Sequence, residues 1–227
     1  MARINFADEL ENAERGLMSE GSLVRQQLNR VTEALARRNV ELAETVIAQD
    51  DPVDDIYLAN DARVLDLIAL QAPVAGDLRL VSAILHSNLH LERIGDLCVN
   101  IAKFVLNRHP YPTETAMVRT LTDMGDRARE MIDMGLRAFA ERDAVLAEEL
   151  PVKDDALDRL NRAMLDHLRE HMADPESFEW ASQLLLVARY LERIGDHAVD
   201  IGEQVSYLVT GVFREFTDAS HPDDRLP

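Results

Sequence analysis

Hydrophobic residues along the chain recur at spacings of three, four and seven positions, the period of α-helices with one apolar face. In the first half this pattern predicts helices over about 6–37, 40–70 and 74–107. Pro52 falls inside the second of these helices and predicts a kink near Asp50. The third helix ends at the His-Pro-Tyr-Pro segment 109–112, which we take as the boundary between two halves of the chain.

The second half repeats this plan, with helices predicted over about 113–142, 144–172 and 175–211. Pro151 interrupts the middle helix much as Pro52 does in the first half. Asp174 precedes Pro175 in the way that an N-cap residue precedes the first helical residue. Pro73 marks the corresponding turn in the first half, so the third long helix of each half begins next to a proline.

One six-residue sequence, Leu-Glu-Arg-Ile-Gly-Asp, occurs at 91–96 and again at 191–196, inside the third helix of each half. A match of this length predicts two copies of one structural unit. We therefore predict an all-α fold in which six helices form two tandem three-helix bundles, over 1–109 and 110–212. Residues 213–227 lack the helical pattern and are predicted to form a disordered tail.

Acidic and amide residues recur every four positions through each copy of the repeat. They are Glu92, Asp96 and Asn100 in the first half and Glu192, Asp196 and Asp200 in the second. This spacing places three oxygen-bearing side chains on one stripe of a helix, where like charges repel by about 0.2–0.5 kcal/mol per pair. The acids lie in mid-helix, beyond the reach of the helix dipole, so we favour a bound metal cation over a solvated acidic surface.

The second helix of each half offers further oxygen ligands in pairs, Asp50 with Asp54 and Asp154 with Asp158. Each pair could face a stripe if the second and third helices pack antiparallel. The helix dipole also favours Asp near a helix start, so a structural surface role stays open for these four residues. Such oxygen ligands suit Mg, Mn, Fe, Ca, Ni or Zn, and the sequence does not identify the metal.

We expect the histidines near the repeat to contribute to packing rather than to bind a metal. His86 and His90 have the spacing of helical metal ligands but lie on a different helix face from Glu92. His197 has Leu97 as its counterpart in the first copy. We therefore expect these histidines to be packed or interfacial.

Three small residues of the repeat helices are given packing roles. Gly95 and Gly195 lie in mid-helix, where glycine costs about 1 kcal/mol relative to alanine, so we expect each to permit close approach of another backbone. Cys98 lies about 200° around the helix from Asp96 and is predicted to pack in the core. A single cysteine also excludes an intramolecular disulfide.

The formal charge of −18 argues against nucleic acid as a partner, because phosphate binding needs a basic face. Metal cations and basic protein surfaces are the partners that an acidic field attracts, although solvated acids alone can produce such a charge. The N-terminal residues contain no signal peptide, and there is no uncharged apolar run of about 18 residues. We expect a cytoplasmic protein that is peripheral to a membrane at most.

Motifs of nucleotide binding and of nucleophilic catalysis are missing from the sequence. It has no Gly-x-x-x-x-Gly-Lys loop, no Gly-x-Gly-x-x-Gly and no Cys-x-x-Cys. Nor does a Glu-x-x-His pair accompany the acids, as it does in ferritin-like bundles. A metal-binding adaptor that is not an enzyme is therefore the leading hypothesis. The alternatives are a metal-dependent hydrolase of phosphate compounds and a metal store or buffer.

The doubled hexapeptide, the Pro-Val-Ala-Gly-Asp-Leu-Arg segment 73–79 and the Met-Ala-Asp-Pro segment 172–175 together resemble the PhoU family. The resemblance covers about 6–211 and implies two three-helix bundles that bind metal ions or multinuclear clusters. It implies as ligands Glu92, Asp96, Asn100, Glu192, Asp196 and Asp200. Because Asn100 removes one negative charge from the first site, we expect the site with Asp200 to hold its cation more tightly.

The same resemblance implies a regulatory role in phosphate homeostasis. Proteins of this family restrain the phosphate ABC transporter, through its ATPase subunit, and keep the phosphate-sensing histidine kinase in its repressing state. They often form homodimers and act at the cytoplasmic face of the membrane. These partners and this location are expectations for the present chain.

Overall fold

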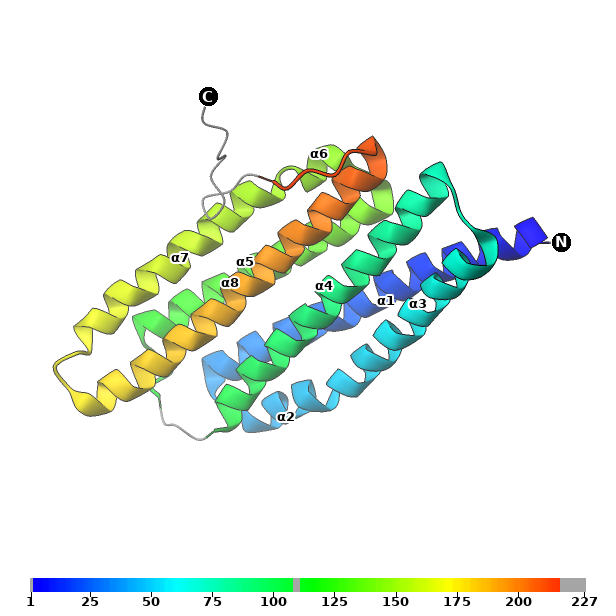
Figure 1. Ribbon diagram of the computed structural model, residues 1–227. Coiled ribbons are helices and arrows are strands. Elements are labelled where there is room, and N and C mark those ends of the chain that lie inside the picture. The colour runs from blue at the N-terminus through cyan, green and yellow to red at the C-terminus, as the bar shows by residue number, and fades with distance from the viewer. Residues whose placement is uncertain (1, 108–110, 217–227) are drawn as a thin grey trace, which may run out of the picture.

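A computed structural model describes residues 2–107 and 111–216 of the chain. Within them the regular structure is entirely α-helical, as Figure 1 shows, so the predicted all-α fold is confirmed. The helices are α1 (Ala2–Arg37), α2 (Val40–Ala48), α3 (Asp50–Gln71), α4 (Ala75–Leu106), α5 (Ala116–Glu141), α6 (Ala144–Ala147), α7 (Leu150–Glu170) and α8 (Pro175–Thr210). Six of these described helices are long, and α2 and α6 are short segments that precede α3 and α7.

The expected interruptions lie where helix caps and prolines place them. Asn39 accepts a hydrogen bond at 2.9 Å from the backbone N–H of Leu42 and so caps α2. The predicted kink near Asp50 is a break at Gln49, and Pro52 stands in the first turn of α3. Pro151 likewise lies in the first turn of α7, where a missing N–H costs no helical hydrogen bond.

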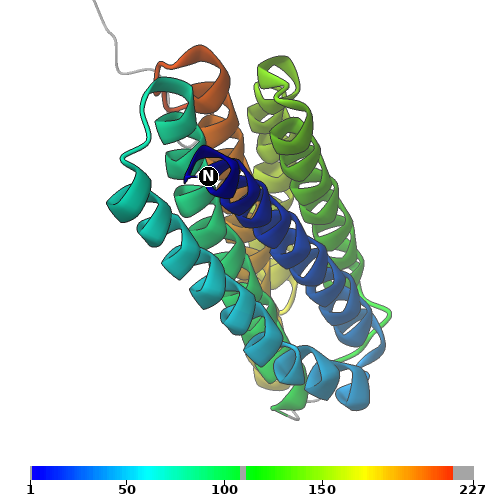
Figure 2. The same cartoon turned by 90° about the vertical axis from the view of Figure 1, so that its right-hand side faces the viewer.

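Two sets of three long helices pack side by side, α1 with α3 and α4, and α5 with α7 and α8 (Figure 2). The sets meet through α4 against α8 and α1 against α5. The first pair is antiparallel, since Arg79 near the start of α4 donates a 3.3 Å hydrogen bond to the carbonyl of Leu208 near the end of α8. One hydrophobic cluster runs through both sets. The predicted boundary at 109/110 lies outside the described residues.

A pair of glycine contacts reveals the internal symmetry at the α1–α5 interface. A Cβ on Gly21 would lie 2.6 Å from Leu136, and a Cβ on Gly125 would lie 2.4 Å from Thr32. These two contacts are equivalent, because Gly125 and Leu136 each stand one hundred and four positions after Gly21 and Thr32. Positions in α1 therefore correspond to positions in α5 at this offset, whereas α4 and α8 correspond at an offset of one hundred.

Beyond α8 the chain turns at Gly211, whose φ is +74°. Phe216 then packs against the core, and its backbone N–H donates a 2.7 Å hydrogen bond to Glu203. The rest of the predicted tail, residues 217–227, lies outside the described residues. Among the helices that the structure describes, none combines the length and the apolar character needed to cross a membrane.

Candidate metal-binding clusters

The first acidic cluster lies where α3 packs antiparallel to α4. Asp50 and Asp54 of α3 face Glu92 and Asp96 of α4, and burial together with repulsion among these carboxylates raises the pKa of Asp50, Asp54 and Glu92. Arg93 lies 3.4 Å from a carboxylate oxygen of Glu92 and 3.3 Å from one of Asp96, so it pairs within its own helix. The structure thus brings the predicted pair on α3 to the predicted stripe on α4.

Glu20 of α1 is a member of this cluster that the sequence analysis missed. Its side chain is 0% exposed, and neither carboxylate oxygen has a hydrogen-bond partner among the described residues. Burial, followed by repulsion from Glu92 and Asp54, raises the pKa of Glu20 from 4.5 to about 9. The signal in the sequence was an acid on the apolar face of the first helix, between Leu17 and Val24.

The second acidic cluster lies between α7 and α8. Asp154 and Asp158 of α7 are 1% and 4% exposed, and Glu192 of α8 is 5% exposed. Burial and repulsion from Asp196 raise the pKa of Glu192 from 4.5 to about 7. Burial also raises the pKa of Asp196, with Asp158 adding to the effect and Arg189 opposing it.

Arginines accompany the carboxylates of the second cluster. Arg189 donates a hydrogen bond to one oxygen of Glu192, while the other oxygen, Oε2, is buried without a hydrogen-bond partner in the described part of the chain. Arg162 donates a 3.3 Å hydrogen bond to Asp158. This cluster is therefore partly neutralised by the protein itself.

The glycines of the repeat define which acids correspond in the two halves. A Cβ on Gly95 would lie 3.5 Å from Val53, and one on Gly195 would lie 2.5 Å from Leu157. Asp54 and Asp158 follow Val53 and Leu157 directly, so these two acids correspond in structure, and Asp50 corresponds to Asp154 in the same way. The hundred-residue register, which pairs Asp54 with Asp154, does not hold on this helix because the chain from Asp158 to Glu192 is four residues shorter than the chain from Asp54 to Glu92.

The close approach expected at these glycines is made by side chains rather than by a backbone. At Gly95 the nearest atom to a built Cβ is the side-chain oxygen of Gln27, at 3.3 Å. At Gly195 the near atoms are those of Leu157 and of Asp154, at 2.5 and 2.7 Å. The expectation of a backbone neighbour was therefore wrong, since the missing Cβ makes room for side chains of the first and second helices.

The third members of the two stripes leave the acidic clusters. Eight residues advance the helix by about 80° beyond two full turns, which carries the third position toward the α4–α8 interface. Asp200 there lies 3.2 Å from Nδ1 of His90 and 3.3 Å from Nδ1 of His197. Asn100 lines a hollow of about 320 Å³ beside Tyr190. The first two members of each stripe thus face the second-helix acids, whereas the third lies at the α4–α8 interface; in the second half Asp200 still lines one hollow with Asp196.

The interfacial placement expected for His90 and His197 is confirmed, because their rings meet across the α4–α8 interface with centroids 5.4 Å apart. Burial lowers the pKa of His90, although neighbouring Asp200 opposes the shift. For His86 the expectation of a packed or interfacial position was wrong, because its side chain is exposed and bonds the carbonyl of Ser82 one turn back on its own helix, at 2.8 Å. Cys98 is 0% exposed, which confirms its predicted place in the core.

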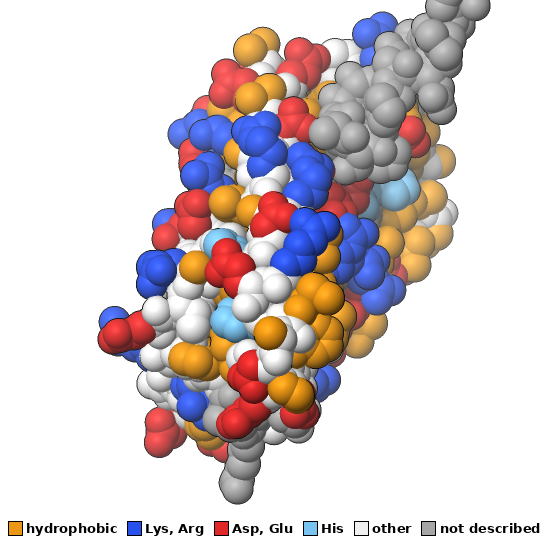
Figure 3. All heavy atoms as spheres, turned by 90° about the vertical axis from the view of Figure 1, so that its left-hand side faces the viewer, with side chains coloured by type: hydrophobic (Ala, Val, Ile, Leu, Met, Phe, Trp, Pro, Cys, Tyr) orange, Lys and Arg blue, Asp and Glu red, His pale blue; other side chains and the backbone are white. Residues whose placement is uncertain are grey.

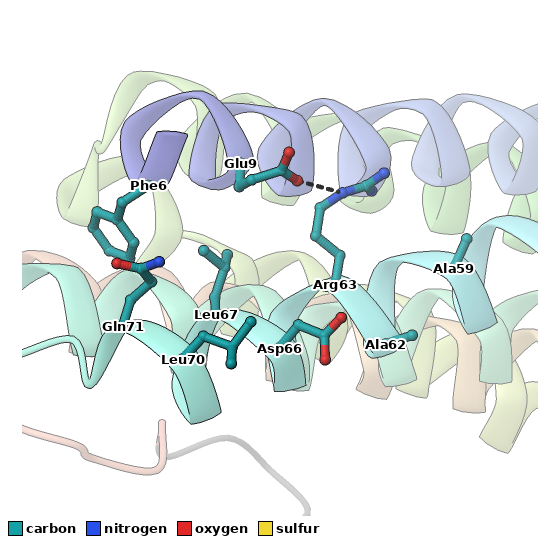
Figure 4. A pocket seen from close by; sticks show the side chains of 9 residues that line it. All are labelled: Phe6, Glu9, Ala59, Ala62, Arg63, Asp66, Leu67, Leu70 and Gln71. Carbon is teal, nitrogen blue, oxygen red and sulfur yellow. Dashed lines mark ion pairs between the residues drawn. The ribbon is translucent and has the colours of Figure 1, made fainter. Parts of the chain in front are cut away.

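A hollow of about 470 Å³ lies elsewhere, between the start of α1 and the end of α3 (Figure 4). Phe6, Leu67 and Leu70 line it, and an ion pair of 3.4 Å between Glu9 and Arg63 crosses it. On the face shown in Figure 3, acidic and basic side chains are interspersed with hydrophobic ones. The net negative charge therefore does not form a uniform acidic field on that face.

The chemistry of the donors suits metal cations, although in neither cluster do ligand atoms of three described acids lie within 4.8 Å of one another, so a cation would have to draw the side chains closer. Carboxylate oxygens are the ligands that hard cations prefer, and each cluster offers them from two or three helices. Buried carboxylate oxygens without hydrogen bonds, as on Glu20 and Glu192, need a proton or a cation to offset their desolvation. Whether the clusters do bind metal stays a prediction.

Comparison with known proteins places both halves of the chain in one family. The model of the PhoU domain matches residues 17–105 and 121–205. A phosphate-specific transport system accessory protein PhoU homolog from Clostridium acetobutylicum is 34% identical over 213 residues, which are 93% of this chain and 97% of that protein. A homolog of the same description from Aquifex aeolicus is 35% identical over 204 residues, 89% of this chain and 92% of the relative.

Solved structures agree with this assignment. The crystal structure of PhoU from Pseudomonas aeruginosa superposes with a TM-score of 0.84 at 33% identity, covering 91% of this chain and all of that one. The phosphate transport system regulatory protein PhoU from Streptococcus pneumoniae gives a TM-score of 0.85 at 31% identity, with 93% of this chain covered. The predicted pair of repeats and the fold are thus found in proteins of that name, and the chain belongs to the PhoU family.

Proposed function

We propose that this chain is a metal-binding accessory protein of a phosphate-specific transport system, which restrains phosphate uptake when phosphate is sufficient. The observation that carries the proposal is the pair of equivalently placed carboxylate clusters with buried, unbonded oxygens on Glu20 and Glu192. The names of the relatives, which are accessory proteins of phosphate-specific transport, supply the physiological context.

The residues that would hold the cations are those gathered at the two clusters. They are Glu20, Asp50, Asp54, Glu92 and Asp96 in the first, and Asp154, Asp158, Glu192 and Asp196 in the second. Divalent or trivalent ions, singly or as a multinuclear cluster, suit this donor set. A bound cation would supply positive charge to carboxylates that repel one another across helices, and so favour the close packing of α3 on α4 and of α7 on α8.

The proposed partners are the ATPase subunit of the phosphate ABC transporter and the phosphate-sensing histidine kinase, approached from the cytoplasmic face. A homodimer peripheral to the membrane is the proposed form. The role is regulatory rather than enzymatic, in keeping with relatives that are named as accessory proteins. Turnover of phosphate esters that is lost in Asp196→Ala would instead favour the hydrolase, and many rapidly released ions per chain would favour a store.

A deletion strain tests the regulatory role. Without the chain, alkaline phosphatase and transporter expression should rise in high phosphate, and the wild-type chain should restore repression. A Glu92→Gln, Asp96→Asn double variant should fail to restore it, whereas Glu44→Gln, which changes an exposed acid of α2, should restore it fully. Unchanged expression in the deletion strain would count against the proposal.

Elemental analysis tests the metal. Protein purified without chelator should carry metal that is reduced in Glu92→Gln and in Glu192→Gln, but not in Glu44→Gln. Metal content that is indifferent to both cluster variants would remove these residues as ligands.

A further inference from the structure

We propose that His90, His197 and Asp200 form a third metal site, one turn of α8 beyond Asp196 of the second acidic cluster, which takes one tetrahedral divalent transition ion such as Zn²⁺. His90 comes from α4, whereas His197 and Asp200 come from α8. In the part of the chain that the structure describes, this is the one group of three His, Cys or acidic residues whose ligand atoms all lie within 4.8 Å of one another. The site would join the two halves of the molecule.

The spacing of the three ligand atoms is that of a zinc site. Nδ1 of His90 lies 3.2 Å from Nδ1 of His197 and 3.2 Å from Oδ2 of Asp200, and the remaining edge is 3.3 Å. Bonds of about 2.0–2.1 Å to a tetrahedral ion separate its ligands by about 3.3 Å. One ion can therefore contact all three atoms without any rearrangement of the backbone.

The surroundings leave a fourth position open. The side chains of His90 and His197 are 20% and 18% exposed, and that of Asp200 is 40% exposed. A hollow of about 320 Å³ opens beside the group, and the charged side chains of Arg193, Asp196 and Glu203 line it together with His197 and Asp200. Three protein ligands with an open fourth position are the arrangement of zinc sites that bind water or an exogenous ligand.

The internal repeat shows that packing does not require these three residues. The corresponding positions are Tyr190 for His90, Leu97 for His197 and Asn100 for Asp200. Those residues occupy the symmetry-equivalent part of the same α4–α8 interface, where Asn100 and Tyr190 line a hollow of similar volume. The α4–α8 interface thus also packs around three residues that do not form a metal site. The two histidines occur on only one of the two symmetry-related sides of this interface.

The chemistry of this group also differs from that of the clusters. Imidazole nitrogen suits Zn, Co and Ni, whereas all-carboxylate sites suit Mg, Ca and Mn. The chain would therefore discriminate between two classes of cation at sites on neighbouring turns of α8. An ion at the histidine site would bind the folded state more tightly than the unfolded chain, in which the three ligands are not held together, and so stabilise the contact of α4 with α8.

Cobalt titration of the full chain, stripped of metal, tests the site. A tetrahedral ion with nitrogen ligands gives Co²⁺ intense visible absorption, which oxygen-ligated octahedral sites do not. The wild-type chain should develop this absorption up to one equivalent and lose it on addition of Zn²⁺. His90→Tyr and His197→Leu, which copy residues that the repeat already accommodates, should each weaken Co²⁺ binding by at least about 100-fold, more than loss of a supporting contact costs.

Two matched variants separate this site from its neighbours. His86→Gln, one turn away on α4 and exposed, should keep the absorption, and so should Asp96→Asn in the first acidic cluster. Zn²⁺ should raise the melting temperature of the wild-type chain and of His86→Gln but not of His197→Leu. Absorption that survives both His90→Tyr and His197→Leu, or a folded wild-type chain that never develops it, would overturn the proposal.

Discussion

The two acidic clusters occupy equivalent places in the two halves but differ in which of their acids are buried. In the first cluster α1 contributes Glu20, which is fully buried, while Asp54 of α3 is exposed. In the second cluster the position equivalent to Glu20 is Met124 of α5, also fully buried, by the offset that relates Gly21 to Gly125. There the buried acids stand on α7 instead, where Asp158 is 4% exposed.

The difference extends to how each cluster is neutralised. Glu192 and Asp158 accept hydrogen bonds from Arg189 and Arg162. Glu20 has no such partner among the described residues, so it must hold a proton or lie beside a cation. One structural unit has thus been adapted in two ways: the first cluster depends on an added positive charge, and the second supplies part of that charge itself.

The largest expected effect is that of Glu20→Met, which introduces at position 20 the residue that stands at the equivalent position 124 in the second half. The pKa of Glu20 is about 9 in the folded chain and 4.5 in the unfolded chain. Below pH 4.5 Glu20 is protonated in both states and does not oppose folding. As the pH rises from 4.5 toward 9, the unfolded chain loses this proton more readily than the folded chain, so the free energy of unfolding falls. At pH 7 the free energy of unfolding is lowered in this way by about 3 kcal/mol. Glu20→Met should therefore stabilise the metal-free chain by about this amount more at pH 7 than at pH 4.5.

Urea unfolding of chelator-treated protein at these two pH values measures the effect. Met124→Leu, a volume-conserving change at the equivalent position, should leave the pH dependence as in the wild type. If Glu20→Met and the wild type lose stability in parallel between the two pH values, Glu20 is ionised at no cost, and the contrast between the clusters fails.

Glu20 also marks the limit of what the sequence could predict about the site. Glu92 and Asp96 were found because they recur at helical spacing in two copies, and such repetition is visible in the sequence. A single acid in a long helix has no such pattern, and its burial depends on how α1 packs against α3 and α4. The meeting of His90 with His197 depends in the same way on the antiparallel contact of α4 with α8, which no local spacing encodes.

More of the fold than of the site could be predicted from the sequence, because the spacing of apolar residues indicates which face of each helix is buried. Prolines and caps supplied the ends: Asp174 caps α8 by accepting from the N–H of Ser177 at 3.1 Å, as predicted from the following Pro175. What the period could not give was the correspondence between α3 and α7. The offset between the halves changes from 104 to 100 residues between α7 and α8, and only the side-chain contacts of Gly95 with α3 and of Gly195 with α7 reveal where it changes.

The pH dependence of metal binding is the next largest contrast. A cation must displace the proton of a protonated ligand, so affinity rises by about tenfold per pH unit until that ligand is ionised. For the first cluster, isolated in Glu192→Gln, Mn²⁺ affinity should rise steadily from about pH 6 to 8.5 because the pKa of Glu20 is about 9. For the second, isolated in Glu92→Gln, the rise should level off above about pH 7, the pKa of Glu192.

Calorimetric titration in buffers of different ionisation enthalpy also counts the protons released. Near pH 7 binding to the first cluster should release about one proton from Glu20, and binding to the second about half a proton from Glu192. Identical pH profiles in the two variants would mean that the clusters do not differ in the way that their burial indicates.

The repeat glycines provide a smaller contrast in packing. A Cβ on Gly195 would lie 2.5 Å from Leu157 and 2.7 Å from Asp154, whereas the nearest atoms to one on Gly95 would be those of Gln27, at 3.3 Å, and of Val53, at 3.5 Å. Overpacking costs about 1–3 kcal/mol, and alanine regains about 1 kcal/mol of helix propensity. Gly195→Ala should therefore destabilise the chain by about 1 kcal/mol in urea unfolding, and Gly95→Ala should be close to neutral. Equal losses in the two variants would indicate that the helices are equally crowded at both glycines.

The smallest expected effect concerns the third position of the stripe, where sequence and structure give opposite expectations. The spacing makes Asn100 a ligand of the first site, so Asn100→Asp should add a charge and tighten binding. The structure places Asn100 beside Tyr190 at the α4–α8 interface, apart from the acidic cluster. Mn²⁺ affinity of the first cluster should therefore change by less than about threefold in Asn100→Asp, since a charge outside the cluster acts only through screened solvent. Asp96→Asn, measured in the same Glu192→Gln background, should weaken binding far more. A gain of tenfold or more in Asn100→Asp would return this position to the metal site and remove the division of each stripe into two cluster residues and one interface residue.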